Sequence, residues 1–166
     1  MTKNLILLNG TMGVGKTTTG KHLQQLLPNC AFLDGDWCWD AQPWIVTNET
    51  KAMVQRNIIF VLNSFLTCSE YQNIIFCWVM HEQSILDALL TSLDIRDCQV
   101  RKFSLICSES ALTARLTKDI SVGLRTPELL TRSLPRLGNY AGMDTQKVDV
   151  SDCTAQAAAQ LIRDFL

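Results

Sequence analysis

Residues 4–20 read NLILLNGTMGVGKTTTG, and this stretch decides the fold. Residues 4–8 are apolar after the first position, and a continuously apolar run predicts a strand that is buried on both faces of a sheet. Residues 10–17 fit the pattern G-x-x-x-x-G-K-[ST], and an amphipathic helix is expected from Lys16 to Leu27, where Pro28 follows. A strand, a glycine-rich turn and a helix in this order predict a loop that closes around an anion.

The glycines of this loop allow successive backbone N–H groups to converge on phosphate oxygens, at positions where a Cβ would intrude. Lys16 is expected to reach the β- and γ-phosphates of a nucleoside triphosphate, and the Thr17 hydroxyl to ligate Mg²⁺. The helix N-terminus adds its positive dipole end to the same site. The residues expected to bind the phosphates are Gly10, Thr11, Met12, Gly13, Val14, Gly15, Lys16, Thr17 and Thr18.

Short apolar runs alternate with longer helical patterns along the rest of the chain, which indicates an α/β fold with a parallel sheet. Further strands are expected at residues 31–33, 74–79, 100–106 and 146–150. Helices are expected over residues 50–68, 82–93 and 153–165, and two more begin near residues 108 and 127. No linker or internal repeat interrupts the pattern, so residues 1–166 are expected to form one domain.

Two carboxylates, Asp34 and Asp36, follow the second expected strand, at the edge where open α/β sheets bind ligands. One can hold hydrated Mg²⁺ while the other accepts a proton from an attacking hydroxyl, and phosphoryl transfer needs little more chemistry than that. The alternative is that Asp-Gly-Asp only forms a turn, since its residues favour turns. No aspartate follows the third expected strand, where a Walker B aspartate is usual, and this raises the importance of Asp34.

Four arginines lie between the fourth and fifth expected strands, and guanidinium groups suit phosphate geometry. We expect Arg115 and Arg125 to neutralise the phosphoryl group during transfer. Residues from about 115 to 136 are expected to form a lid that excludes water. For Arg132 a solvated helix face is an equal alternative, and Arg136 is expected at the surface.

Trp37, Trp39 and Trp44 form an aromatic cluster after the acidic pair. They either line a pocket for a ring-bearing acceptor or pack in the core, and the sequence favours neither. His81 follows the third expected strand, and we expect a structural role for this lone histidine.

The composition excludes several classes of protein. The chain has 166 residues, 47% of them hydrophobic, and a net charge of −1, so no overall basic field attracts nucleic acid or anionic membranes. No apolar stretch approaches the roughly 20 residues that span a bilayer, and no secretory signal is recognised. The seven cysteines lack zinc-site spacing and are expected to be reduced. A cytoplasmic protein, either monomer or dimer, is expected.

With these residues in place, the chain resembles the small P-loop kinases of the shikimate kinase, gluconate kinase and chloramphenicol phosphotransferase type. The resemblance implies the P-loop NTPase fold, with five parallel strands in the order 2-3-1-4-5 and helices on both faces. It also implies ATP as donor, Asp34 at the magnesium ion and Asp36 at the acceptor hydroxyl. Arg115 matches the arginine that opens the lid in these kinases, and Arg125 matches a lid arginine.

The chain departs from shikimate kinases in two places. It lacks their glycine-rich third strand, and the tryptophan-rich segment after Asp36 is not their pattern. An aromatic or nucleoside-like acceptor fits these tryptophans better than shikimate does.

The predicted function is an ATP- and Mg²⁺-dependent phosphotransferase that acts on a hydroxyl of a small molecule, with catalytic residues Lys16, Asp36, Arg115 and Arg125. Two alternatives remain, a nucleoside or nucleotide kinase and a nucleotide-binding switch without a small acceptor. The scarcity of basic residues in 37–55 counts against a monophosphate acceptor. The lack of an Asn-Lys-x-Asp motif counts against a GTPase.

Overall fold

The computed structural model describes residues 2–166 and contains one five-stranded sheet in which every neighbouring pair of strands is parallel. The strands are β1 (Lys3–Asn9), β2 (Cys30–Asp34), β3 (Asn73–Cys77), β4 (Cys98–Ile106) and β5 (Gln146–Asp149). Their spatial order is β2-β3-β1-β4-β5, which confirms the fold that the resemblance implies. The strand that carries the glycine-rich loop therefore lies in the middle of the sheet.

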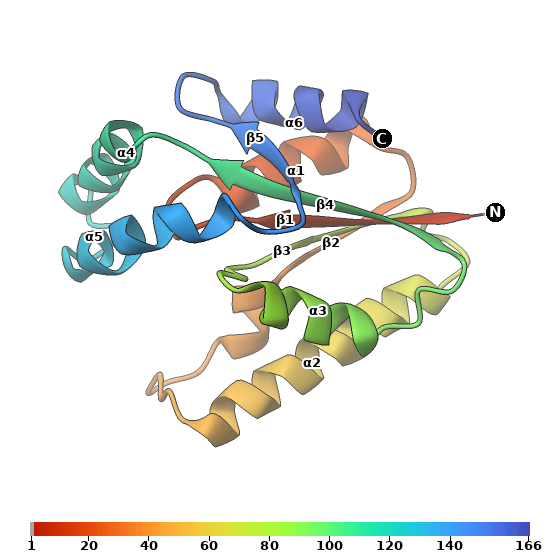
Figure 1. Ribbon diagram of the computed structural model, residues 1–166. Helices are drawn as coiled ribbons and strands as arrows, with labels where there is room; N and C mark the ends of the chain where they lie inside the picture. Colours follow the sequence, from red (N-terminus) through yellow and green to blue (C-terminus); the bar gives the residue numbers. More distant parts are fainter. Residues whose placement is uncertain (1) are drawn as a thin grey trace.

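Helices cover both faces of the sheet, and two more lie beyond the carboxyl ends of its strands (Figure 1). The α-helices are α1 (Lys16–Leu26), α2 (Asn48–Thr67), α3 (Gln83–Thr91), α4 (Glu109–Ser121), α5 (Glu128–Ser133) and α6 (Ala155–Asp164). Helices α1 and α6 pack together on one face, whereas α2 and α3 cover the other (Figure 1). All the expected strands and helices are confirmed, and their ends differ by at most two residues.

Two 3₁₀ segments have no counterpart in the sequence prediction, η1 (Gly35–Trp39) and η2 (Leu134–Tyr140). Such short helical turns leave no periodic apolar pattern that a sequence reading could detect. The predicted N-cap of α4 is confirmed, because the Ser108 hydroxyl accepts a hydrogen bond from the Ala111 amide at 3.2 Å.

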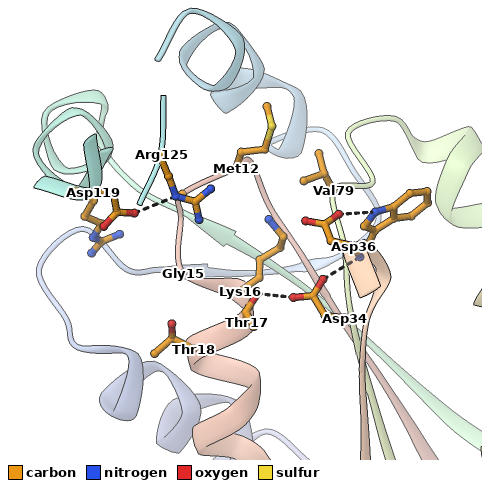
Figure 2. A pocket seen from close by; sticks show the side chains of 13 residues that line it. Met12, Gly15, Lys16, Thr17, Thr18, Asp34, Asp36, Val79, Asp119 and Arg125 are labelled. Carbon is orange, nitrogen blue, oxygen red and sulfur yellow. Dashed lines mark hydrogen bonds and ion pairs between the residues drawn. The ribbon is translucent and has the colours of Figure 1, made fainter. Parts of the chain in front are cut away.

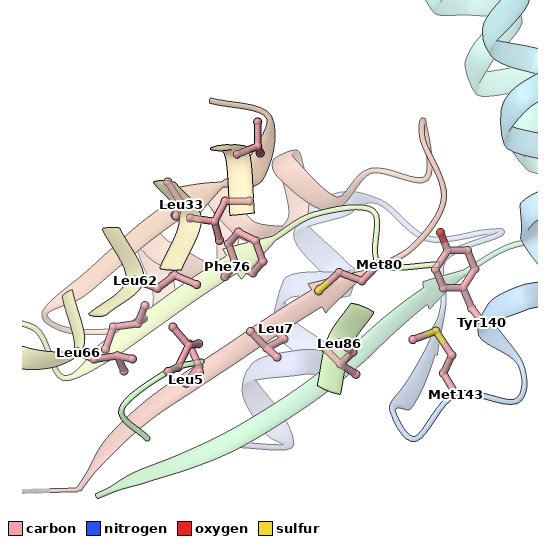
Figure 3. Close-up of a cluster of buried hydrophobic side chains, with 14 residues drawn as sticks. Leu5, Leu7, Leu33, Leu62, Leu66, Phe76, Met80, Leu86, Tyr140 and Met143 are labelled. Atoms are coloured by element: carbon pink, nitrogen blue, oxygen red, sulfur yellow. The ribbon is translucent and has the colours of Figure 1, made fainter. Parts of the chain in front are cut away.

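The alternating directions of its side chains explain why β1 is apolar throughout. Leu5 and Leu7 belong to the buried cluster under α2 and α3, which Figure 3 shows together with Leu62 and Phe76. The residues between them, Ile6 and Leu8, belong to a second cluster under α1 and α6. All four β1 side chains are 0% exposed, as expected for a central strand covered on both faces.

This layering places the carboxyl ends of all five strands at one edge, where the glycine-rich loop, η1 and the start of the β3–α3 connection lie side by side. Among residues 2–166, no helix is long and apolar enough to cross a membrane.

Candidate active site

A cavity of about 270 Å³ opens at the carboxyl edge of the sheet (Figure 2). All six residues predicted to be catalytic or metal-binding line it: Lys16, Thr17, Asp34, Asp36, Arg115 and Arg125. The other lining residues are Met12, Gly13, Gly15, Thr18, Trp78, Val79 and Asp119. Groups that are up to 113 positions apart in the chain, from Met12 to Arg125, therefore share one pocket. Their chemical roles stay predictions, whereas their proximity is a structural fact.

The backbone of the glycine-rich loop adopts conformations that side chains disfavour. Gly13 has φ +83° and Gly15 has φ +108°, both in the left-handed region where glycine is the residue without steric cost. A Cβ on Gly13 would also lie 2.4 Å from Cδ2 of Leu116, whereas a Cβ on Gly15 would meet nothing within 4 Å. The loop therefore needs a glycine at position 13 for its conformation and its close packing, and at position 15 for its conformation alone.

Three residues predicted to bind phosphate, Gly10, Thr11 and Val14, are buried behind the loop and do not line the cavity. The Thr11 hydroxyl donates to the carbonyl oxygen of Ser133 at 2.9 Å, which fastens the loop to the end of α5. These residues shape the loop from within.

Lys16 extends into the cavity, where its Nζ donates to the Thr11 carbonyl oxygen at 2.9 Å (Figure 2). Burial lowers the pKa of this ammonium group to about 8, while Cys77, Asp36 and Asp34 partly oppose the shift. A positive charge enclosed in this way favours a polyanionic ligand, because the anion would restore the solvation that burial removed.

Thr17 and Asp34 meet at the base of the cavity, with 2.5 Å between the Thr17 hydroxyl and Oδ2 of Asp34. The other carboxylate oxygen of Asp34 accepts a hydrogen bond from the Asp36 amide at 3.0 Å and caps η1. Asp34 therefore caps the turn and also lines the cavity, so the turn at Asp-Gly-Asp is compatible with a role of Asp34 in the site.

The oxygen pair of Thr17 and Asp34 fits magnesium, which prefers hard oxygen ligands and commonly takes one or two from protein and others from phosphate and water. Among residues 2–166, no group of three or more His, Cys, Asp and Glu side chains could hold a metal ion by itself.

Cys77 ends β3 opposite Asp34 in the sheet register. Burial and the nearby Asp34 raise the pKa of its thiol, which therefore stays neutral.

Asp36 is held by a residue that the sequence interpretation missed. The indole Nε1 of Trp78 donates to Oδ1 of Asp36 at 3.2 Å. Surrounding protein raises the pKa of the Asp36 carboxyl, and the Asp34 charge adds to the rise, while Lys16 and the Trp78 bond lower it. Trp78 follows β3 at the same edge as Asp34, and that position at a strand end was the signal that could have identified it.

The two predicted catalytic arginines are held by different partners. The Arg115 guanidinium donates to the carbonyl oxygens of Val14, Ser151 and Val150, and so joins the phosphate loop to the segment after β5. Arg125 Nε donates to Oδ2 of Asp119 at 3.0 Å in a partly exposed ion pair (Figure 2). Arg115 is thus anchored to backbone carbonyl oxygens, whereas Arg125 is paired with the side-chain carboxylate of Asp119.

Trp37, Trp39 and Trp44 do not line the cavity, and only Trp39 packs against the core, whereas Trp37 and Trp44 are each 53% exposed. Trp39 packs against the cluster under α2, and the Trp37 ring contacts Phe32 edge-on at 5.5 Å between centroids. Trp44 stands 5.6 Å from the Trp39 ring. The tryptophan that forms a wall of the cavity is Trp78.

The remaining basic residues lie outside the cavity. The Arg132 guanidinium lies 5.9 Å from the centroid of Trp44, so α5 contacts the segment between η1 and α2. Burial lowers the pKa of His81, and the Arg136 charge acts in the same direction. Arg136, which was expected at the surface, is partly buried, and the structural role of His81 stays a prediction.

Known structures share this fold over nearly the whole chain. The tunicamycin resistance protein of Deinococcus radiodurans has a TM-score of 0.74 and 22% identity, covering 98% of this chain and 95% of that protein. A sugar kinase from Janibacter sp. has a TM-score of 0.73 and 14% identity, with 98% and 93% covered. Shikimate kinase from Acinetobacter baumannii, solved with shikimate, has a TM-score of 0.66 and 22% identity, with 98% and 92% covered.

At identities this low, these likenesses show the fold alone, and among curated proteins no sequence matches the chain. A family model gives the more direct assignment. Residues 6–123 match the model AAA_18, described as an AAA domain, and this span holds β1, the glycine-rich loop and the acidic strand end. Since the match covers well over half of the 166 residues, the protein belongs to the AAA_18 family of P-loop domains.

Proposed function

We propose that the protein is a kinase that transfers the γ-phosphoryl group of ATP to a hydroxyl of a small molecule. The observation that carries this proposal is the placement of Asp36 in the same cavity as Lys16 and the glycine-rich loop. A switch protein needs the loop, but it has no use for a proton acceptor held beside the terminal phosphate. Two of the similar structures are a sugar kinase and a shikimate kinase, which supports the same class of reaction.

The transfer replaces one P–O bond with another and moves one proton. The acceptor oxygen attacks the γ-phosphorus while its proton passes to Asp36, and the bond between that phosphorus and the bridging oxygen of ADP breaks. Burial and the Asp34 charge raise the pKa of Asp36, which makes it a stronger proton acceptor than an ordinary aspartate. Lys16 and the loop amides hold the phosphates, and Arg115 and Arg125 offset the charge that develops on them.

Thr17 and Asp34 would hold Mg²⁺, which supplies positive charge to the β- and γ-phosphates when it is bound. The hydrogen-bonded pair already places two oxygen ligands together at the base of the cavity. Asp34 also fixes the Asp36 amide, so the metal site and the proton acceptor share one turn.

We further propose that residues 1–166 act as one kinase domain in which the segment from about 115 to 136 is a lid. Arg115 and Arg125 bring two guanidinium groups from this segment to the cavity. The segment is fastened at one end by Arg115 and at the other by the bond between Thr11 and Ser133. Between these anchors every residue from Ser121 to Glu128 is exposed, as is expected of a segment that opens and closes.

ADP release from Mg²⁺-ATP across a pooled acceptor panel tests the proposed function. The pools hold nucleosides, nucleoside monophosphates, sugar acids, shikimate and hydroxylated antibiotics. Lys16→Ala is the blank, and Lys51→Ala, which changes an exposed lysine on α2, is the matched control. The proposal expects one pool to raise ADP release well above the acceptor-free rate in the wild type and in the control, but not in the blank.

Two results would contradict the proposal. Stimulation that persists in Lys16→Ala would mean that the glycine-rich loop is not the site of phosphoryl transfer. Tight ATP binding with no stimulation by any pool would favour a nucleotide-binding switch.

A further inference from the structure

A second, smaller cavity of about 80 Å³ lies between α2 and α3, and it shares one wall with the first cavity. Its lining is mostly aliphatic, including Ile58 and Ile59 from α2 and Ile85 and Leu89 from α3. Trp78 lines both cavities. Trp78 therefore lies where the polar pocket that holds Asp36 meets an apolar pocket over the neighbouring helices.

The Trp78 ring is held in this place from two directions. Its Nε1 donates to Asp36 Oδ1 at 3.2 Å. Its ring also lies directly against Gly35, because a Cβ on that glycine would come 2.5 Å from both Cγ and Cδ1 of the indole. Any side chain at Gly35 would push the ring away, so the turn between the two aspartates is shaped to receive it.

We propose that Trp78 joins the two cavities into one acceptor site, as a positioning residue for Asp36 and as the wall that orients an alcohol with a compact apolar group. The hydroxyl of this acceptor lies at Asp36, and its apolar group enters the cavity between α2 and α3. The inference rests on the proposed kinase function and adds to it the substrate class and the residue that selects it.

The lining of the second cavity restricts the acceptor further. Among its lining residues, all of which lie in the described part of the chain, none is charged, and the polar ones are Gln55 and Ser92. A charged group placed there would lose its hydration without gaining an ionic partner. At about 80 Å³ the cavity is several times larger than a water site, which leaves room for a small hydrocarbon group. An uncharged, compact apolar alcohol meets both conditions.

The first test reads Trp78 directly, without requiring turnover. The chain has four tryptophans, so a nitrogen-15 spectrum shows up to four indole N–H signals, and Trp78→Phe identifies the one that disappears. Asp36→Asn is expected to shift this signal, because it replaces the carboxylate that accepts the bond. Benzyl alcohol is expected to shift it too, whereas glycerol at the same concentration leaves it in place.

Ala88→Leu provides the matched block of the apolar cavity. Ala88 lines that cavity from α3 and is exposed, so the larger side chain fills the space without entering the core. The response of the Trp78 signal to benzyl alcohol is expected to be lost in this variant, while the response to Asp36→Asn is kept. Gly35→Ala is expected to shift the Trp78 signal in the absence of any alcohol.

The second test uses ADP release from Mg²⁺-ATP with benzyl alcohol as the acceptor. Trp78→Phe keeps a ring but loses the N–H, and it is expected to lower kcat about tenfold with little change in KM, since it leaves the proton acceptor present but unheld. Trp78→Leu loses the ring as well and raises KM in addition. Ala88→Leu raises KM more than it lowers kcat.

The outcomes separate the inference from the function on which it rests. If benzyl alcohol leaves the Trp78 signal unmoved, or if Trp78→Phe turns over with the kcat and KM of the wild type, the inference is wrong, and the kinase function can still stand. If the Trp78 signal responds as expected but no alcohol in any pool raises ADP release, the subsite is supported and the kinase function is contradicted.

Discussion

The two sides of the proposed active site are built by different means. The proposed phosphate side comes from one continuous stretch, residues 10–18, in which three glycines have positive φ, a backbone form that can direct amides towards an anion. The acceptor side comes from η1, the end of β3 and helices α2 and α3, and its contacts are made by side chains. A site made of backbone leaves a recognisable pattern in the sequence, whereas a site made of side chains from separate elements does not.

The two sides are also expected to differ in how they respond to amino-acid substitution. The glycine-rich loop is fixed on its inner side by buried residues: Thr11 bonds to Ser133 at the end of α5, and Val14 packs in the cluster under α1 and α6. The acceptor side depends on single contacts such as the bond from Trp78 to Asp36. We therefore expect the phosphate side to respond to substitution through stability, and the acceptor side through catalysis and substrate choice.

The largest effect is expected from Asp36→Asn, which removes the proton acceptor and keeps the shape of the side chain. Acceptor-dependent ADP release should fall about 10³-fold, within the range ascribed to general base catalysis, while ATP binding is retained. Stopped-flow or coupled assays measure the rate, and calorimetry measures ATP binding. Asp40→Asn is the control, since Asp40 is exposed and outside the cavity. Equal losses in both variants would refute the role of Asp36.

The loop glycines should separate conformation from packing. Gly13→Ala is expected to lower the free energy of unfolding by about 3 kcal/mol, because it adds a clash with Leu116 to the cost of positive φ. Gly15→Ala carries the conformational cost alone, about 1–2 kcal/mol. Urea denaturation without nucleotide measures both values. A larger loss at Gly15 would show that the Leu116 contact does not constrain the loop.

The lowered pKa of Lys16, about 8, predicts how nucleotide binding depends on pH. A bound triphosphate raises this pKa, so binding favours the protonated lysine and takes up a proton when the pH is near 8. Affinity should therefore be constant well below pH 8 and fall by up to about tenfold per pH unit above it. Calorimetry in two buffers of different ionisation enthalpy measures the uptake, with EDTA present to exclude metal ions. Lys16→Met should abolish it, and uptake that survives in that variant would point to another group.

The smallest effect is expected where α5 contacts the segment after η1. The Arg132 guanidinium over Trp44 is exposed to solvent, and such cation–π pairs contribute about 0.5–1 kcal/mol. A double-mutant cycle of Arg132→Gln and Trp44→Leu, measured by urea denaturation, isolates this coupling. The control cycle combines Arg163→Gln with Trp44→Leu. Arg163 lies on α6, which packs with α1 on the face of the sheet opposite α2. Coupling of equal size in both cycles would show that the contact is not specific.

The sequence predicted the fold and the position of the glycine-rich loop between β1 and α1, for a physical reason. A buried parallel strand must be apolar throughout, and an anion-binding turn must contain glycines, so β1 and the loop each leave a local pattern. Asp34 and Asp36 were also identified, because they follow a strand end directly.

The acceptor side was predicted less completely. Trp78 was missed because it fell inside the strand expected at residues 74–79, and Trp37, Trp39 and Trp44 were considered instead because they cluster after the acidic pair. Nothing local in the sequence tells that the Trp78 indole lies against Gly35 and bonds to Asp36, since this arrangement depends on the pairing of β2 with β3. The cavity between α2 and α3 depends in the same way on tertiary packing.

The central place of β1 has a consequence for how the chain folds as it is synthesised. Asn4 lies opposite Asn73 on one side and Gln99 on the other, so both neighbours of this strand are made long after it. Closing such distant pairs costs entropy before any contact repays it, which slows folding. Until β4 leaves the ribosome, the glycine-rich loop is attached to a strand with an open edge. The segment that comes first in the sequence is therefore among the last to reach its native surroundings.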